Sequence, residues 1–327
     1  MNISIWVTDI CNLSCKYCYV NENKGDKKFS YEKIHDFLTF IDDRAENEPD
    51  EEIQINFFGG EPLIAFDIIK EIVSKIKEKP YHERVFYFIT SNGLLLDEKI
   101  ANFFKENQFA VSISIDGTEE IHNKNRKDKN HFDTYEKVIQ GCELLARYGV
   151  KIRVRGTYDS ETVDTLYQST KHLAGLSFAN EVVMVPDYFD TKWNEKKIEK
   201  MKQEVIRIRE NLSDKIYMGE ELKGCKTWCG GGISSFHIDI NGNIFPCSYV
   251  VGKEFCIGTL KEGLDRRKID ELKTVYRTRN KACNGCGMED YCLSRKCKFI
   301  NYALTGNLLE PSPVVCHMEK LKAIKFI

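Results

Sequence analysis

The sequence contains no apolar run that approaches the roughly 18 residues a membrane-spanning helix requires. Residues Met1 to Val7 also lack the charged start and long apolar segment of a secretory signal peptide. Neither sign of charge dominates, because 48 lysines and arginines face 50 aspartates and glutamates. That balance argues against a nucleic-acid-binding protein that relies on a strongly basic surface. We therefore expect a cytoplasmic protein that binds neither membranes nor nucleic acid.

Cysteine, in contrast, is abundant, with 13 residues in a chain of 327. An odd number cannot pair completely, and disulfides rarely persist in the cytoplasm. The remaining interpretations are metal binding, catalysis and burial. Three cysteines lie within eight residues near the amino terminus, nine lie between Cys225 and Cys316, and only Cys142 lies between these groups. Two separate regions therefore have spacing typical of metal ligands.

The cysteine-poor middle of the chain alternates between short β-rich runs and amphipathic stretches. The expected strands cover residues 3–7, 53–58, 85–90, 111–115, 151–157 and 181–185. The expected helices cover residues 31–43, 66–77, 97–106, 134–148, 162–173 and 194–211. Six β-α units in tandem predict an α/β fold, a parallel sheet with right-handed crossovers. We expect a partial (β/α)6 TIM-like barrel with its functional groups at the C-terminal ends of the strands.

Short motifs follow the first four expected strands. The three-cysteine cluster follows the first, Gly59-Gly60-Glu61-Pro62 follows the second, and Ser91-Asn92-Gly93 follows the third. Ser114-Ile115-Asp116-Gly117 closes the fourth. Each of these motifs taken alone is also typical of an ordinary turn or strand end. Their shared placement is the stronger indication, because in a barrel all four would meet at one mouth.

The first cluster has the pattern Cys11-x3-Cys15-x2-Cys18. Three thiolates can bind three irons of a [4Fe–4S] cube and leave the fourth iron open to another ligand. The alternative is a zinc site with a remote fourth ligand. It is disfavoured because no Cys or His follows at zinc-finger spacing.

With Tyr17 before its last cysteine, this motif resembles that of the radical S-adenosylmethionine (radical SAM) enzymes over about residues 1–200. The resemblance implies that SAM chelates the open iron and is cleaved to a 5′-deoxyadenosyl radical, which abstracts a substrate hydrogen. It implies that Tyr17 contacts adenine and that Glu61 accepts a charge-assisted hydrogen bond from the SAM amino group. The other candidate SAM-pocket residues are Gly59, Gly60, Asn92, Ser112, Ser114, Asp116 and Arg155. Ser112, Ser114 and Asp116 include candidate ribose ligands. Arg155 is a candidate partner of the SAM carboxylate.

The C-terminal cysteines resemble the SPASM extension of a subset of radical SAM enzymes. The pattern is Cys229-x12-Gly242-x4-Cys247, then Cys283-x2-Cys286-x5-Cys292-x4-Cys297, then Cys316. The resemblance implies two auxiliary [4Fe–4S] clusters, three clusters in all. It assigns the first to Cys225, Cys229, Cys247 and Cys297, and the second to Cys283, Cys286, Cys292 and Cys316. Two structural zinc sites are the alternative.

The chain divides into an expected barrel (1–211), a bridging segment (212–224), a small cysteine-rich SPASM domain with a β-hairpin turning at Asn241-Gly242 (225–316) and a C-terminal helix (317–327). Segments 21–28 and 122–130 have the composition of loops. We expect Cys142 in the core. Cys256 is expected to be buried, with a catalytic thiol as the weaker alternative.

SPASM-bearing radical SAM enzymes mostly modify peptides and proteins, so the resemblance implies a maturase that oxidises a ribosomally made peptide. A thioether or carbon–carbon crosslink is the first choice for its product. The alternatives are a protein-residue oxidase of the sulfatase-maturing kind, a small-molecule oxidase, and a non-enzyme that carries electrons or binds zinc. Ser248 stands where the sulfatase-maturing branch has an aspartate, which weakens that alternative. Expected partners are the precursor peptide and a reductant such as flavodoxin or ferredoxin. Because the chain begins almost at the first strand, leader recognition is expected from the barrel, the SPASM region or a separate protein.

Overall fold

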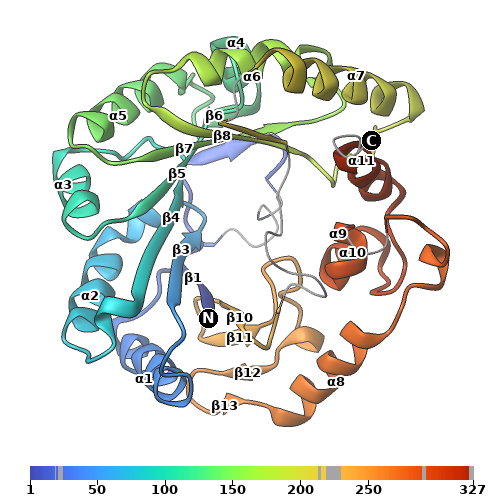
Figure 1. Ribbon diagram of the computed structural model, residues 1–327. Coiled ribbons are helices and arrows are strands. Elements are labelled where there is room, and N and C mark those ends of the chain that lie inside the picture. Colours follow the sequence, from blue (N-terminus) through green and yellow to red (C-terminus); the bar gives the residue numbers. More distant parts are fainter. Residues whose placement is uncertain (19, 21–24, 213–214, 219–229, 289–291, 324–327) are drawn as a thin grey trace.

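The fold is built on one eleven-stranded sheet that curves into a partial barrel (Figure 1). The structure, a computed structural model, describes residues 1–18, 20, 25–212, 215–218, 230–288 and 292–323. Among them, no helix is both long enough and apolar enough to cross a membrane.

All six predicted barrel strands are present and run parallel to their neighbours in the order β1-β3-β4-β5-β7-β8. Their bounds are β1 Asn2–Thr8, β3 Ile53–Gly59, β4 Val85–Ser91, β5 Ala110–Ser114, β7 Ile152–Tyr158 and β8 Ala179–Pro186. The predicted partial (β/α)6 barrel is therefore confirmed, and the C-terminal ends of its strands meet at one mouth.

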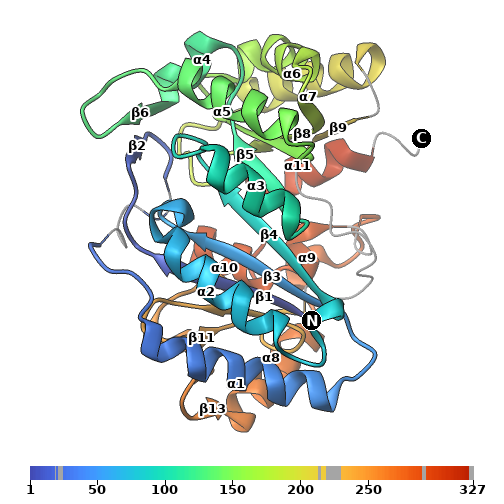
Figure 2. The same ribbon diagram turned by 90° about the vertical axis from the view of Figure 1, so that its left-hand side faces the viewer.

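The six predicted helices pack around the outer face of this sheet (Figures 1 and 2). They are α1 Tyr31–Asn47, α2 Phe66–Lys77, α3 Glu98–Glu106, α5 Tyr135–Arg147, α6 Leu166–Gly175 and α7 Glu195–Asn211, with 3-10 turns at Pro62–Ala65, His82–Arg84 and Val163–Thr165. Helix α2 shows why the pattern works, because its apolar residues recur at helical spacing and all lie buried: Ile68, Ile69, Ile72, Val73 and Ile76. Each such side chain contributes roughly 1.5–3 kcal/mol relative to an exposed one.

The sheet continues beyond both edges of the predicted barrel. On one side, β10 (Ser235–Ile238) pairs parallel with β1 and forms the predicted hairpin with β11 (Asn243–Phe245). Two short strands, β12 (Gly258–Thr259) and β13 (Gly263–Leu264), follow antiparallel. On the other side, β9 (Ile216–Met218) pairs with β8, within the segment expected to be only a bridge. The division of the chain into four parts stays a prediction.

Short helices follow the outer strands and lie opposite the barrel strands in Figure 1. They are α8 Arg266–Arg277, α9 Leu293–Lys296, α10 Lys298–Thr305 and α11 Pro313–Ala323, with 3-10 turns at Lys253–Phe255 and Lys281–Cys283. Helix α11 contacts both α7 and α9. It begins at Pro313, earlier than the predicted residue 317, because proline suits the first helical turn. Residues 324–327 lie outside the described residues.

The expectation of a loop over residues 122–130 is wrong. The segment forms helix α4 (Glu119–Asn125) and strand β6 (Arg126–Asp128), and β6 pairs antiparallel with β2 (Leu13–Cys15). Its polar composition suggested a loop, but several of its polar side chains make hydrogen bonds inside the protein. The buried Asn123 side chain, for example, accepts hydrogen bonds from the backbone amides of Thr134 and Tyr135 at the start of α5. Of the other expected loop, residues 21–24 lie outside the described residues.

Candidate active site

The three N-terminal cysteines lie on a loop, here called the cysteine loop (residues 9–18), that leaves the C-terminal end of β1. Cys11 is buried, and Cys15 and Cys18 are half-buried. The amide of Leu13 donates to Cys11 Sγ over 3.4 Å, and the amide of Cys18 donates to the carbonyl of Cys15 over 3.3 Å. The β2–β6 pairing holds the middle of this loop in place. The amide of Lys16 adds one more backbone hydrogen bond after the pairing by donating to the carbonyl of Asn125 in α4.

The loop presents thiols that fit an iron–sulfur cluster. Burial raises the pKa of Cys15 to about 11, Arg126 lowers it, and the nearby Cys18 and Cys11 raise it further. Thiolates that repel one another across a short distance are stabilised when each binds a metal. Among the described residues, no three His, Cys, Asp or Glu side chains converge on one metal ion. A cube makes a different demand, because each of its irons takes a separate thiolate.

Two glycines allow β3 to touch the start of the cysteine loop. The amide of Gly60 donates to the carbonyl of Thr8, and the amide of Glu61 donates to that of Ile10, both over 2.9 Å. A Cβ atom on Gly60 would lie 2.4 Å from the Ile10 oxygen, and one on Gly59, whose φ is +139°, would lie 2.2 Å from the Thr8 oxygen. Only glycine permits this approach.

The carboxylate of Glu61 joins the second and third motifs. It is 1% exposed; its Oε1 accepts from the Leu63 amide (3.1 Å) and the Ser91 hydroxyl (2.8 Å), and its Oε2 accepts from the Asn92 amide (2.7 Å). Burial raises its pKa to about 7, although these donors lower it. The Asn92 side chain in turn donates to Asn12 of the cysteine loop over 2.7 Å. Because Oε2 has one donor, it can still accept another, so the predicted bond to an amino group stays a prediction.

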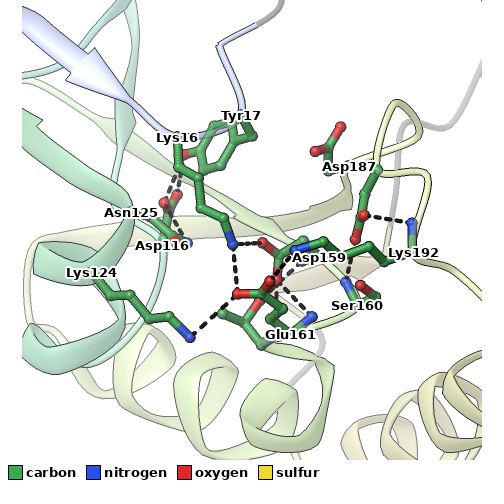
Figure 3. Close-up of polar contacts among 12 residues, drawn as sticks. Lys16, Tyr17, Asp116, Lys124, Asn125, Asp159, Ser160, Glu161, Asp187 and Lys192 are labelled. Atoms are coloured by element: carbon green, nitrogen blue, oxygen red, sulfur yellow. Dashed lines mark hydrogen bonds and ion pairs between the residues drawn. The ribbon is translucent and has the colours of Figure 1, made fainter.

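Asp116 accepts hydrogen bonds from four protein groups. Tyr17 donates its hydroxyl at 2.6 and 2.8 Å to the two oxygens, and the Thr157 amide donates at 3.0 Å. Asn125 and Arg126 donate at 3.3 and 3.1 Å. Figure 3 shows Tyr17 pointing toward Asp116 and Asn125. The carboxylate therefore holds the cysteine loop, β6 and β7 together, and its predicted contact with a ribose stays a prediction.

On its other side the cysteine loop is held by charge at the end of β7. Lys16 lies 3.1 Å from an oxygen of Asp159 and 2.7 Å from one of Glu161. Glu161 also pairs with Lys192 at 2.6 Å, and Lys124 lies 3.7 Å away (Figure 3). Sequence reasoning missed this group, although Asp159 follows the fifth strand directly and its position at a strand end was an available signal.

The remaining predicted SAM residues lie on β5 and β7. Ser114 and Arg155 are partners in the parallel register, so they lie side by side, Ser114 at the C-terminal end of β5 and Arg155 in the middle of β7. Ser112 lies two residues earlier, deeper in the barrel and on the same face as Ser114. Their roles as ligands stay predictions.

The structure brings part of the C-terminal cysteine set together. Burial raises the pKa of Cys316, and the nearby Cys283 and Cys286 raise it further. These three belong to one predicted auxiliary cluster, whose fourth ligand, Cys292, is buried before α9. Of the other predicted set, Cys247 is half-buried and Cys297 is buried, whereas Cys225 and Cys229 lie outside the described residues. Both ligand sets stay predictions.

The two leftover cysteines differ. Cys142 is fully buried in the core, as predicted. Cys256 is only half-buried, so the expectation of burial is met in part; its thiol donates to the Gly258 carbonyl over 3.2 Å. It lies two residues before β12, and β11 and β10 separate that strand from β1. A catalytic role for Cys256 stays a prediction.

A carboxylate stands where the end of β8 meets the cysteine-rich region. Asp187 follows β8 directly, and burial, then Asp190 and Asp159, raise its pKa, while Lys16 lowers it. Two residues later, the ring of Phe189 lies 6.1 Å from that of Tyr249, centre to centre. The loop after β8 therefore lies beside the segment that contains Ser248.

Comparison with known proteins agrees with this geometry. A sequence model of the radical SAM superfamily matches residues 5–171. The cysteine-type anaerobic sulfatase-maturating enzyme of Clostridium novyi (strain NT) is 31% identical over 284 residues, which cover 77% of this chain and 74% of that enzyme. The structure of anSMEcpe with bound AdoMet and Cp18Cys peptide superposes with a TM-score of 0.80 at 21% identity and covers 99% of this chain and 96% of that one. Streptococcus suis SuiB, whose structures include one bound to the precursor peptide SuiA, has a TM-score of 0.67 at 14% identity, covering 96% of this chain and 75% of that one.

Proposed function

Because the chain belongs to the radical SAM superfamily, and within it to the sulfatase-maturating, SPASM-bearing type, we propose that it oxidises one side chain of a protein or peptide substrate by two electrons. The observation that carries this proposal is the 31% identity to the Clostridium novyi enzyme over about three quarters of both chains. It favours a residue oxidase over the peptide crosslink that the sequence alone predicts first. The SAM-binding [4Fe–4S] cluster belongs to the family, whereas the two auxiliary clusters are part of the proposal.

The chain's own residues would divide the work as follows. Cys11, Cys15 and Cys18 would hold the cluster, which together with SAM supplies an oxidant strong enough to remove a hydrogen atom from carbon. Glu61 would accept from the SAM amino group, and Ser114 and Arg155 would hold its other polar groups. The substrate then has one proton and one electron left to lose. The cysteines of the C-terminal region would hold clusters that supply an acceptor for the electron, which a redox partner would finally take up.

We propose Asp187 as the group that takes the proton. The sulfatase-maturing branch has an aspartate at the position of Ser248, and this chain has none there. Asp187 lies at the mouth of the barrel, on a loop whose Phe189 packs against Tyr249, the neighbour of Ser248. A carboxylate on this loop, beside the segment that has none, would take the proton in place of the missing one. General-base catalysis by such a group contributes about 10²–10⁴-fold.

Replacing Asp187 with asparagine is expected to lower substrate oxidation by about 10²-fold, because the amide is not a base. Cleavage of SAM to 5′-deoxyadenosine should continue, since hydrogen-atom abstraction precedes proton loss. Mass spectrometry of the peptide and chromatography of 5′-deoxyadenosine measure the two steps in one reaction. Asp270→Asn, on the exposed face of α8, is the matched control. Wild-type peptide yields from Asp187→Asn would rule out this role.

The proposed function is tested with reconstituted enzyme, SAM, a reductant and peptides that contain a single Cys or Ser. We expect 5′-deoxyadenosine together with an aldehyde on that residue, detected by reaction with a hydrazide. The Cys peptide reaches the aldehyde when water hydrolyses the thioaldehyde left by the loss of two hydrogens and hydrogen sulfide is released. The Ser peptide should lose two hydrogens. Cys15→Ala, which cannot complete the cluster, is the inactive control. SAM cleavage with peptides of unchanged mass would show that the proposed substrate class is wrong.

A crosslinking maturase of ribosomal peptides is the second candidate. Ser248 in place of the aspartate favours it, and so does the fold shared with SuiB, which has been seen bound to its precursor peptide SuiA. A crosslink also removes two hydrogens but forms no aldehyde. A peptide product that has lost two hydrogens and does not react with the hydrazide would therefore support this candidate against the first.

A further inference from the structure

A buried arginine, Arg126, lies beside the cysteine loop. Its side chain is only 10% exposed. Nε lies 3.1 Å from Asp116, Nη1 lies 3.9 Å from Cys15 Sγ, and the centre of the guanidinium lies 5.3 Å from the centre of the Tyr17 ring. One cation thus contacts a carboxylate, an aromatic face and a cluster-ligand sulfur.

Backbone pairing fixes this arrangement. In the β2–β6 ladder, Arg126 stands directly opposite Cys15, and the next amide of the loop, that of Lys16, donates to the carbonyl of Asn125. The Tyr17 hydroxyl donates to the same Asp116 that holds Arg126. The loop and the arginine therefore cannot move independently.

Stability alone does not explain this ion pair. Removing two charges from water is expensive, and buried pairs are often no more stabilising than apolar side chains of similar size. Here the pair also turns a guanidinium N–H toward a sulfur that would bind iron. Hydrogen bonds to cluster sulfurs and nearby charge are the means by which proteins set iron–sulfur reduction potentials.

We propose that Arg126 is a positioning residue that sets the reduction potential of the cluster bound at Cys15, with Asp116 as its counter-charge. Reduction adds an electron, so a cation beside a ligand sulfur favours the reduced state and an anion opposes it. Asp116 partly offsets the effect of the Arg126 charge on the reduction potential and holds the guanidinium group in place. The inference rests on the family's cluster at the cysteine loop and does not depend on which substrate is oxidised.

The experiment is a redox titration of the full-length, reconstituted protein, followed by electron paramagnetic resonance without any peptide substrate. The signal of the loop cluster is identified because it changes when SAM is added. Arg126→Gln should lower the equilibrium constant for reduction about tenfold, or 59 mV for one electron. Arg126→Lys keeps the charge and should stay within about threefold of wild type. Asp116→Asn removes the anion and should shift the constant in the opposite direction.

Arg153→Gln is the matched control, since Arg153 is half-exposed and pairs with Glu181 across β7 and β8, outside the β2–β6 ladder. It should leave the potential unchanged. If Arg126 has a purely structural role, the Arg126 and Asp116 variants should lose iron, or their equilibrium constants for reduction should all shift in the same direction. A wild-type potential in Arg126→Gln with a full iron complement overturns the proposal. If Arg126→Gln binds no cluster, Asp116→Asn provides the test. An equilibrium constant for reduction of Asp116→Asn at or below that of wild type then overturns the proposal.

Discussion

Replacing Gly60 with alanine is expected to remove the cluster from the cysteine loop while leaving the barrel folded. The added Cβ would lie 2.4 Å from the Ile10 oxygen and 2.9 Å from the Asp9 oxygen, and both are backbone atoms that cannot rotate away. Either the end of β3 or the start of the loop must move, which costs about 1–3 kcal/mol. Cys11 follows Ile10 directly, so the loop is the part that shifts.

Iron analysis measures this effect, because the loss of one cube lowers the content by about four irons per chain. Production of 5′-deoxyadenosine should fall by at least about 10²-fold. Gly175→Ala is the matched control, since a Cβ there meets no atom within 4 Å. Full iron content and SAM cleavage in Gly60→Ala would show that the approach of β3 does not shape the cluster loop.

Glu61→Gln is expected to weaken SAM binding about tenfold or more. The amide has the shape of the carboxylate, but it turns a donor toward either the Asn92 amide or the Leu63 amide, which then stays unsatisfied in a buried place. A buried amide without a hydrogen-bond acceptor costs about 1–3 kcal/mol of stability. The amide also loses the negative charge that would attract the SAM amino group.

This variant also makes a pH prediction with a defined sign. Burial raises the pKa of Glu61 to about 7, so below that pH the carboxyl is largely neutral and accepts a hydrogen bond from the SAM amino group more weakly. Affinity of the wild type for SAM should therefore rise between about pH 6 and pH 7.5. Glu61→Gln should show no such rise, and isothermal titration calorimetry compares the two. Glu98→Gln, in the first turn of α3, is the control. If the affinity for SAM rises equally with pH in the wild type and in Glu61→Gln, another group is responsible for the titration.

Local patterns were sufficient for most of the barrel. The alternation in Ile53–Gly59 and the helical stripe of Phe66–Lys77 are set by near neighbours, so strands and helices could be predicted within a few residues. The Asn241-Gly242 turn likewise predicted its hairpin. The pairing of that hairpin with β1 was missed, since no signal within either strand specifies a partner more than 200 residues away.

The candidate site divides in the same way. Gly59, Gly60 and Glu61 could be singled out because they form a short motif, and the structure places them against the cysteine loop, while their role in binding SAM stays a prediction. Arg126 was missed because its surroundings, rich in Lys and Asn, resemble a solvated loop. Only the β2–β6 register shows that it faces Cys15.

The sequence by itself determined which thiolates are available, how they are spaced and in what order strands and helices succeed one another, because these depend on residues close along the chain. Only the tertiary structure decided that Asp116 binds Tyr17 and Arg126 together and that the loop after β8 packs, through Phe189, against Tyr249 beside Ser248. Those contacts arise when distant strands settle into register and burial forces each polar group to find a partner.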